Sequence, residues 1–277
     1  MVLAYSIDEN LEVIEENLIE AAAIYAPSGK EDDMCKYLSE KMIDYVDDIE
    51  IDEEKNFIAY KDNGADKTIV IDAHIDEIIK TDRDAQTYVP VVDGYKVSGK
   101  AMDDRAGVVV FMEVARRLKD TELNVNIVYL GAAQEEIGQY GAKYFVEKNK
   151  ESIDYAFIVD VTWVEPGVEM GDGPALTLKS VPEDYQLPQI VIDSAKDIPY
   201  QISKYDYNFD AITTDALPYH MAGVDNAIFL IPITNMHTRD PKNKPETVDI
   251  RDIDKTASII VNTIYKILEL EDNPYST

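Results

Sequence analysis

Side chains that can bind a metal ion follow four short apolar runs of the chain. The runs are residues 69–73, 127–130, 156–159 and 227–231. The side chains at or just after their ends are His74, Glu135, Glu136, Asp160 and His237. Short continuous apolar runs are typical of parallel strands buried on both faces, and ligands bind beyond the carboxyl ends of such strands. The four runs therefore predict one shared site for metal-assisted chemistry.

The histidines are few, and their positions are informative. The chain has three, and His74 and His237 lie at predicted strand ends, whereas His220 is interpreted as structural or as part of a rim. A single histidine is more often a core or surface residue than a ligand, but two at converging strand ends favour a metal. Asp76 lies two residues after His74 and therefore on the same side of a strand. It either supports the His74 ring from behind a metal or faces water.

The segment Asp103-Asp104-Arg105 opens a predicted helix. Acidic residues are favoured at helix starts in any protein, and this is the better explanation when the segment is taken alone. Only a hairpin separates the segment from the His74 strand, so one of its acids, first of all Asp103, is expected to reach the site. Arg105 can brace a neighbouring carboxylate.

The adjacent pair Glu135-Glu136 is the most specific element of the predicted site. Two adjacent carboxylates at a strand end repel each other unless a cation is near. We assign Glu136 to a metal and Glu135 to proton transfer as a general base. The alternative is a pair of exposed acids in an acidic protein, which the apolar run before them and Gly138 and Gly141 after them make less favourable.

The number of candidate ligands favours two ions. The candidates are His74, Asp103, Glu136, Asp160 and His237. If Asp103 bridges two ions, each has three protein ligands and one open position, which is the pattern of catalytic zinc sites. Nitrogen and oxygen ligands without thiolate suit zinc, cobalt or manganese, and we expect zinc. Two such ions can share a hydroxide and polarise a carbonyl, so the chemistry expected is amide hydrolysis.

The spacing of apolar residues predicts the elements that position these side chains. Helices are expected over residues 6–25 and 29–47, each with a capping box, and over 104–118, 138–148, 183–196 and from about 249. Further strands are expected over residues 49–52 and 56–60, and a hairpin over residues 88–97 turns at Asp93-Gly94. The alternation of strand and helix favours an α/β fold, namely a three-layer α/β/α structure with a mostly parallel sheet.

Composition limits the partners and the cellular location. The 277 residues include 55 acidic and 26 basic ones, a net charge of -29, which makes nucleic acid and anionic membranes unlikely partners. The acidity serves either solubility or the attraction of cationic peptides. No apolar stretch can span a bilayer, the N-terminus lacks the pattern of a signal peptide, and the single cysteine, Cys35, excludes an internal disulfide. We therefore expect a cytoplasmic protein.

Several segments, in this order along the chain, resemble those of one family. They are Asp72-Ala73-His74-Ile75-Asp76-Glu77, Ala101-Met102-Asp103-Asp104-Arg105-Ala106-Gly107, Gln134-Glu135-Glu136-Ile137-Gly138-Gln139-Tyr140-Gly141-Ala142, Val159-Asp160-Val161-Thr162, Thr214-Asp215-Ala216 and Asn235-Met236-His237-Thr238. The family is that of the tetrahedral aminopeptidases, dinuclear metallopeptidases that include glutamyl aminopeptidases and members once labelled endoglucanases. The resemblance covers most of the chain.

The resemblance implies a zinc-dependent exopeptidase-like fold and a function. It implies that two metals are held by His74, Asp103, Glu136, Asp160 and His237, with Asp103 shared. Glu135 would activate the water and Asp76 would support His74. Because the family cuts single residues from peptide N-termini, the expected protein is a metallo-aminopeptidase that acts on short peptides with a free N-terminus.

The chain departs from the family between the His74 strand and the Asp-Asp-Arg segment. Family members carry a β-rich domain there and use it to assemble, whereas only 28 residues separate His74 from Asp103 in this chain. We therefore predict one catalytic domain over residues 1–277, with residues 78–100 forming a short hairpin in place of the family's dimerisation domain. A monomer or a small homo-oligomer is expected rather than the cage-like dodecamer.

Two other functions stay open. One is a deacylase or another dinuclear-metal amidohydrolase, and the other is a non-catalytic metal-binding relative. An endoglucanase is disfavoured because its carboxylate pair needs no metal. The chain also has only one tryptophan, Trp163, and no recognisable aromatic platform for binding a sugar. The preference for a particular first substrate residue depends on loops near residues 165–180 and 205–220 and does not follow from the sequence.

Overall fold

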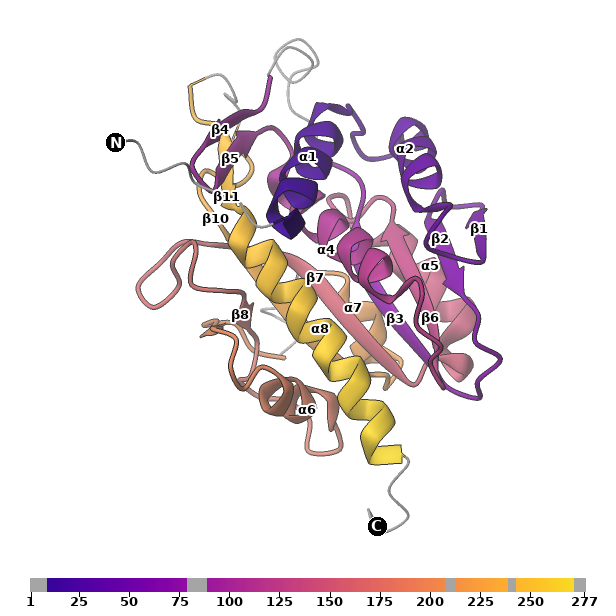
Figure 1. Cartoon of the computed structure of the whole chain (residues 1–277). Helices are drawn as coiled ribbons and strands as arrows, with labels where there is room; N and C mark the ends of the chain where they lie inside the picture. The colour runs from indigo at the N-terminus through magenta and orange to yellow at the C-terminus, as the bar shows by residue number, and fades with distance from the viewer. Residues whose placement is uncertain (1–8, 79–88, 208–212, 239–242, 272–277) are drawn as a thin grey trace.

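The core of the protein is an eight-stranded sheet. The computed structural model describes residues 9–78, 89–207, 213–238 and 243–271 (Figure 1). The strand order is β1-β2-β6-β3-β7-β10-β8-β9. The strands are β1 (Asp48–Ile51), β2 (Phe57–Lys61), β3 (Thr68–His74), β6 (Asn126–Ala132), β7 (Tyr155–Trp163), β8 (Ala175–Leu176), β9 (Gln201–Ile202) and β10 (Asp225–Ile233). The central strands β6, β3, β7 and β10 are parallel to one another, so the predicted mostly parallel sheet is confirmed.

Helices cover both faces of this sheet. Apolar side chains of α1 (Glu9–Ala23), α2 (Asp32–Met42), α4 (Met102–Leu118), α6 (Leu187–Ser194) and α8 (Ile250–Glu271) pack in the core on one face. Those of α5 (Tyr140–Asn149) and α7 (Ala216–Met221) pack on the other face. Figure 1 shows α1, α4 and α8 in front of the sheet and α5 and α7 behind it. This is the predicted three-layer α/β/α arrangement, and it explains why the central strands are apolar on both faces.

The last helix shows how apolar spacing places an element. Residues Ile253, Ala257, Ile260, Ile264 and Ile267 recur at helical spacing, and all five are at most 2% exposed. They form one face of α8, and this face packs in the hydrophobic core between the helix and the sheet. The predicted ends of the helices differ from the observed ends by a few residues, because fraying and capping set helix ends more than apolar spacing does.

The predicted capping box at Ser28 is wrong. Helix α2 begins at Asp32, and the Glu31 carboxylate accepts a 2.6 Å hydrogen bond from the backbone N–H of Gly29. The Ser28 hydroxyl instead donates a 2.6 Å hydrogen bond to the Asp76 carboxylate. The Ser28 hydroxyl, which the local sequence assigned to the start of the helix, is therefore bound by the buried Asp76 carboxylate from another part of the fold. The other predicted capping box includes residues 6–8, which lie outside the described residues.

The predicted hairpin is part of a second, smaller sheet. Strands β4 (Val91–Asp93) and β5 (Lys96–Gly99) are antiparallel and turn at Gly94, whose φ is 62°. Strand β11 (Glu246–Asp249) pairs with β5 and completes three strands. The part of the predicted segment 78–100 that covers residues 79–88 lies outside the described residues. Because β5 leads into α4 and β11 follows the His237 segment, this sheet brings two distant parts of the chain to the site.

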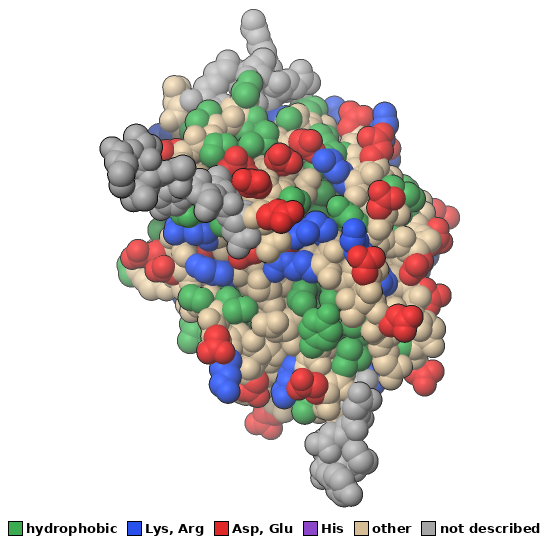
Figure 2. Space-filling model, viewed as in Figure 1, with side chains coloured by type: hydrophobic (Ala, Val, Ile, Leu, Met, Phe, Trp, Pro, Cys, Tyr) green, Lys and Arg blue, Asp and Glu red, His purple; other side chains and the backbone are tan. Residues whose placement is uncertain are grey.

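The surface seen in Figure 2 carries acidic and basic side chains side by side. The net charge of -29 is therefore not gathered into a single negative patch on this face. No helix within the described ranges is both long enough and apolar enough to cross a membrane. Cys35 is buried in the core.

Candidate metal centre

The five predicted ligands come together beyond the carboxyl ends of the parallel strands. His74 is the last residue of β3, Asp103 lies in the first turn of α4, and Glu136 lies in the turn after β6. His237 follows β10 by four residues. Asp160 differs from the prediction, because β7 continues to Trp163 alongside β10 rather than ending at Asp160. The convergence that the sequence predicts is thus observed, although one ligand comes from within a strand.

Asp103 lies between the two histidines. Its Oδ1 is 3.0 Å from His74 Nε2, and its Oδ2 is 2.8 Å from His237 Nε2. His237 Nε2 is also 3.3 Å from Glu136 Oε2. The backbone N–H of Asp103 donates a 3.5 Å hydrogen bond to Glu246 of β11, so the small sheet holds this segment. One carboxylate that presents each oxygen to a different histidine has the arrangement expected of a bridging ligand.

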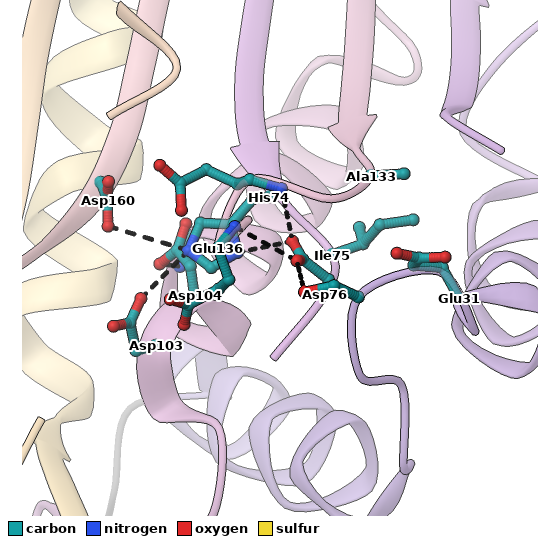
Figure 3. Close-up of polar contacts among 12 residues, drawn as sticks. Glu31, His74, Ile75, Asp76, Asp103, Asp104, Ala133, Glu136 and Asp160 are labelled. Atoms are coloured by element: carbon teal, nitrogen blue, oxygen red, sulfur yellow. Dashed lines mark hydrogen bonds and ion pairs between the residues drawn. The ribbon is translucent and has the colours of Figure 1, made fainter. Parts of the chain in front are cut away.

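A second group of possible ligands shares His74 and includes Asp160. His74 Nε2 is 4.0 Å from Asp160 Oδ1, and Figure 3 shows His74 between Asp76 on one side and Asp103 and Asp160 on the other. Ligand atoms of His74, Asp104 and Asp160 lie within 4.8 Å of one another, as do those of His74, Asp103 and Glu136. Two overlapping groups of three side chains could therefore each contribute to holding a metal ion.

Asp104, which the sequence favours less than Asp103 as a ligand, is also buried. Its Oδ1 accepts a 2.8 Å hydrogen bond from the backbone N–H of Gly107. A Cβ atom on Gly107 would lie 2.2 Å from Asp104 Oδ2, so glycine at this position leaves room for the carboxylate. This packing explains the Asp-Asp-Arg-Ala-Gly spacing at the start of α4.

Asp76 does not face water, and it contacts more than the His74 ring. Its Oδ1 is 3.3 Å from His74 Nδ1. The same carboxylate accepts hydrogen bonds from the backbone N–H groups of Glu135, at 3.0 Å, and Glu136, at 3.3 Å, as well as from Ser28. Asp76 thus orients a candidate ligand and also fixes the turn that carries both glutamates.

Backbone hydrogen bonds hold the turn that carries Glu135 and Glu136, called the glutamate turn below. The backbone N–H groups of Gly138 and Gln139 donate to the carbonyl of Glu135, and that of Gly141 donates to the carbonyl of Ala133. A Cβ atom on Gly141 would lie 2.1 Å from Asn56 Oδ1 and 2.5 Å from the Ala133 backbone. The close approach at Gly141 explains why a glycine follows the two glutamates.

Arg105 is fully buried, and its described hydrogen bonds go to backbone carbonyls rather than to a carboxylate. It donates to the carbonyls of Ile75, at 2.6 Å, and Ala21, at 3.3 Å. The expectation that it braces a neighbouring carboxylate is therefore corrected to a role in fixing the chain after His74. Burial lowers the pKa of Arg105, and the nearby acids Glu77 and Asp76 oppose this effect only in part.

Burial raises the pKa of several acids around the site. Burial, with further repulsion from Asp215 and Asp160, raises the pKa of Glu135 to about 10. Burial and the Asp103 charge raise the pKa of Asp160 to about 7. The pKa of Asp104 is also raised by burial. These carboxylates therefore repel one another in the absence of a cation.

The two histidines have raised pKa values because carboxylates surround them. Hydrogen bonds to Asp103 and Glu136 raise the pKa of His237 to about 10. Burial opposes the charge on His74, but hydrogen bonds to Asp103 and Asp76 outweigh it and raise its pKa. An excess of buried acids over cations, with Glu136 Oε1 buried and lacking a hydrogen-bond partner, is the electrostatic setting that a divalent cation fits.

Two further buried acids of this region, Asp72 and Asp215, lie in segments that resemble the family but have no role predicted from the sequence. Asp72 lies two residues before His74, and Asp215 precedes α7. Among the described residues neither carboxylate makes a well-formed hydrogen bond, and burial raises the pKa of Asp72 to about 8 against the opposing effect of the Tyr219 hydroxyl. The signal for Asp72 was an aspartate inside the apolar run 69–73, whereas Asp215 follows two threonines and carries no such signal. His220, in contrast, packs its ring against Tyr185 and Tyr207, as expected of a structural residue.

Known sequences resemble this chain over the part that carries most of the site. A model of the M42 glutamyl aminopeptidase family matches residues 85–259, which include all predicted ligands except His74. A putative aminopeptidase of Acetivibrio thermocellus is 29% identical over 185 residues, which are 63% of this chain and 53% of that protein. The chain spans about half the length of the curated relatives that it matches.

Known structures share the fold. An aminopeptidase of the archaeon Desulfurococcus kamchatkensis superposes with a TM-score of 0.77 at 22% identity, over 92% of this chain and 95% of that one. The TET1 peptidase of Pyrococcus horikoshii, which can assemble into a tetrahedron or a large octahedral shell, superposes with a TM-score of 0.73 at 20% identity, over 90% and 98%. Since the family model matches more than half of the residues of this chain, the chain belongs to the M42 glutamyl aminopeptidase family.

Proposed function

We propose that this protein is a metallo-aminopeptidase that removes N-terminal residues from short peptides. The observation that carries the proposal is the Asp103 carboxylate, which presents one oxygen to His74 and the other to His237. A bridging carboxylate with a histidine on each side suits a pair of ions that share one nucleophile.

Two divalent ions fit the residues present, and we propose zinc, with cobalt or manganese as alternatives. One ion would be held by His74, Asp103 and Asp160, and the other by His237, Asp103 and Glu136. When bound, the ions polarise the scissile carbonyl and make a water molecule nucleophilic at neutral pH. Three carboxylates offset most of the charge of two divalent ions, which favours their joint binding.

Glu135 is the general base in this proposal. It lines the same cavity as Asp103 and Asp160, and its backbone is held by Asp76. Burial raises the pKa of Glu135 to about 10 in the metal-free site, and two divalent ions beside it would lower this pKa, so that the carboxylate could take a proton from the attacking water. It then passes this proton to the leaving amine.

The cavity beside the site explains how an exopeptidase would count one residue. It has a volume of about 520 Å³, and Glu135, Glu136 and Asp160 are among the residues that line it. The free amino group of the substrate would pair with a site carboxylate. If the peptide continued beyond that nitrogen, the nitrogen would be part of an uncharged amide and could not form this pair. Short peptides with a free N-terminus are therefore the proposed substrates.

We also propose that residues 1–277 act as one catalytic domain. The hairpin of β4 and β5, within residues 78–100, would stand in place of the family's dimerisation domain. Its role here is to lead the chain into α4 and to pair with β11, which supports the Asp103 segment. The cytoplasmic location stays a prediction.

A comparison of free and blocked peptides tests the proposal. We expect peptides with a free amino terminus to be cleaved one residue at a time, a chelator to stop the reaction, and added zinc to restore it. N-acetylated forms of the same peptides should not be cleaved. Turnover of only the N-acylated peptides would instead support a deacylase or another dinuclear-metal amidohydrolase.

A further inference from the structure

The cavity extends from the metal centre across an apolar surface. Beyond the carboxylates, its wall is formed by Ile228 and Leu230 of β10, Trp163 at the end of β7, Tyr205 and Met236. In the paired strands Leu230 lies directly opposite Asp160, a candidate metal ligand. Ile228 is two residues from Leu230 and therefore on the same face of the sheet. An apolar strip thus begins beside the metal centre and leads away from it.

Two of the polar side chains in this part of the wall, Thr177 and Gln139, already have hydrogen-bond partners. The Thr177 hydroxyl is 3.0 Å from the Ser203 hydroxyl. The Gln139 side-chain amide donates a 3.0 Å hydrogen bond to the Thr214 carbonyl. Among the residues that the structure describes along this cavity, none is lysine or arginine. A substrate carboxylate placed against these described residues would find no lysine or arginine among them to pair with.

We propose that this pocket selects peptides whose first residue is large, apolar and uncharged, such as leucine, methionine or phenylalanine, and rejects glutamate. The inference rests on the proposed aminopeptidase function and adds the substrate class to it. It also departs from the glutamyl preference in the family's name. A buried carboxylate without a partner loses its hydration and gains nothing in return, whereas an apolar side chain gains by leaving water.

Within this proposal Leu230 and Ile228 are specificity-determining residues. Both are nearly fully buried and pack in the core between the sheet and helices α5 and α7. A substrate whose carbonyl lies at Asp160 would place its first side chain against Leu230 and then Ile228. Their branched side chains would set the width and the polarity of the pocket.

The first experiment compares tripeptides that differ only in the first residue. The series is Leu-Ala-Ala, Met-Ala-Ala, Phe-Ala-Ala, Glu-Ala-Ala and Lys-Ala-Ala, assayed with the zinc-loaded protein. Methionine and glutamate have similar lengths, so their comparison isolates charge. We expect kcat/KM for methionine to exceed that for glutamate by about 100-fold. Equal or higher values for glutamate or lysine would overturn the inference.

The second experiment places the preference in the pocket. Ile228→Ala should lower the ratio of kcat/KM for Leu-Ala-Ala over Ala-Ala-Ala by about 10-fold, because it removes apolar surface that only leucine contacts. Ile231→Ala is the matched control, since Ile231 is buried in the same strand but packs on the opposite face of the sheet. The ratio does not depend on how much of each variant folds. The same change in both variants would contradict the assignment.

A binding measurement separates this inference from the proposed function. The zinc-loaded Glu135→Gln variant is titrated with Leu-Ala-Ala and with Glu-Ala-Ala in a calorimeter, and the leucine peptide should bind at least about 10-fold more tightly. If no peptide with a free amine is cleaved by the native protein, the proposed function fails. If peptides are cleaved but the glutamate peptide binds as tightly as the leucine peptide, only the pocket preference fails.

Discussion

At the scale of single residues, the site depends on carboxylates that each make several contacts. Asp103 contacts both histidines, and Asp76 contacts His74, Ser28 and the backbone of the glutamate turn. Such carboxylates hold the geometry of a site before any ion binds, which lowers the cost of assembling it. Substitutions at this scale are expected to separate proton transfer from metal binding.

Glu135→Gln should keep both ions but lose most of the activity. The substitution preserves the shape of the side chain and removes its ability to accept a proton, and loss of a general base typically lowers kcat by about 10²–10⁴-fold. Metal content by elemental analysis and kcat on a free-amine peptide are the two measurements. The neighbouring Glu136→Gln serves as the control, because it should lower the metal content. A Glu135→Gln variant with native kcat would refute the base assignment.

Asp76→Asn should weaken metal binding rather than abolish it. The amide keeps the size of the side chain, but it replaces one oxygen that accepts hydrogen bonds with a donor, so the His74 ring or the glutamate turn loses a partner. Substitutions of this kind typically lower metal affinity by about 10–100-fold. Competition with a chromogenic zinc chelator measures the affinity, and Ser28→Ala should give a smaller loss. Native affinity in the Asp76→Asn variant would show that His74 needs no support.

At the scale of elements, short turns at the carboxyl ends of the strands set the site. The glutamate turn is fixed by Gly141, which packs against Asn56 and Ala133, and the start of α4 is fixed by the small sheet through Glu246. The strands and helices alone bring these segments only to the same edge of the sheet. The turns then place the individual side chains, so small changes in the turns should have large effects.

Gly141→Ala should destabilise the protein although Gly141 lies in a helix. Alanine favours a helix interior by about 1 kcal/mol over glycine, but its Cβ atom would lie 2.1 Å from Asn56 Oδ1 and 2.5 Å from backbone atoms of Ala133. Overpacking of this kind typically costs about 1–3 kcal/mol, and we expect a net loss in the free energy of unfolding. Urea denaturation measures it, with Glu147→Ala in the same helix as the exposed control. A more stable Gly141→Ala variant would contradict the packing argument.

At the scale of the whole molecule, acidity and metal binding are linked. The protein carries a net charge of -29 and also buries several acids around the site. Burial raises the pKa of Asp72 to about 8 and that of Asp160 to about 7, and hydrogen bonds to carboxylates raise that of His237 to about 10. The proton occupancy of these groups therefore changes between neutral and alkaline pH when no metal is bound.

The metal-free protein should lose stability as the pH rises from about 6 to 9. A group whose pKa is higher in the folded chain stabilises the fold fully below its unfolded pKa and loses this contribution as the pH rises through the folded pKa. The raised pKa values of Asp160, Asp72 and His237 all act in this direction, at about 7, 8 and 10. The lowered pKa values of Asp103 and Asp76 act only below about pH 4, because both acids are fully ionised above it.

Thermal denaturation with a chelator or with zinc tests this linkage. With a chelator, Tm should fall over this pH range, whereas zinc should raise Tm most at the alkaline end, because the ligands bind metal in their deprotonated forms. An Asp160→Asn variant should show a smaller fall with the chelator. A metal-free Tm that rises with pH would contradict the pKa pattern.

The state of assembly is the second prediction at this scale. We expect a monomer or a small homo-oligomer, because only 28 residues separate His74 from Asp103, where the family resemblance implies a larger domain used for assembly. Sedimentation velocity at micromolar concentration measures the mass directly, and high salt serves as the control for charge repulsion between copies. Twelve subunits would show that other surfaces are sufficient for a cage such as that of TET1.

The amino-acid sequence by itself determined the layered fold and the identity of the five candidate ligands. Apolar runs and helical spacing are local properties, and parallel strands place their carboxyl ends at one edge, so the convergence of His74, Glu136 and His237 followed without coordinates. Only the tertiary structure decided two other features. Asp76 accepts hydrogen bonds from Ser28 and from the backbone of the glutamate turn, and Leu230 pairs with Asp160 to form the start of the apolar pocket. These features depend on strand register and on side chains that meet from distant parts of the chain, and no local pattern encodes such contacts.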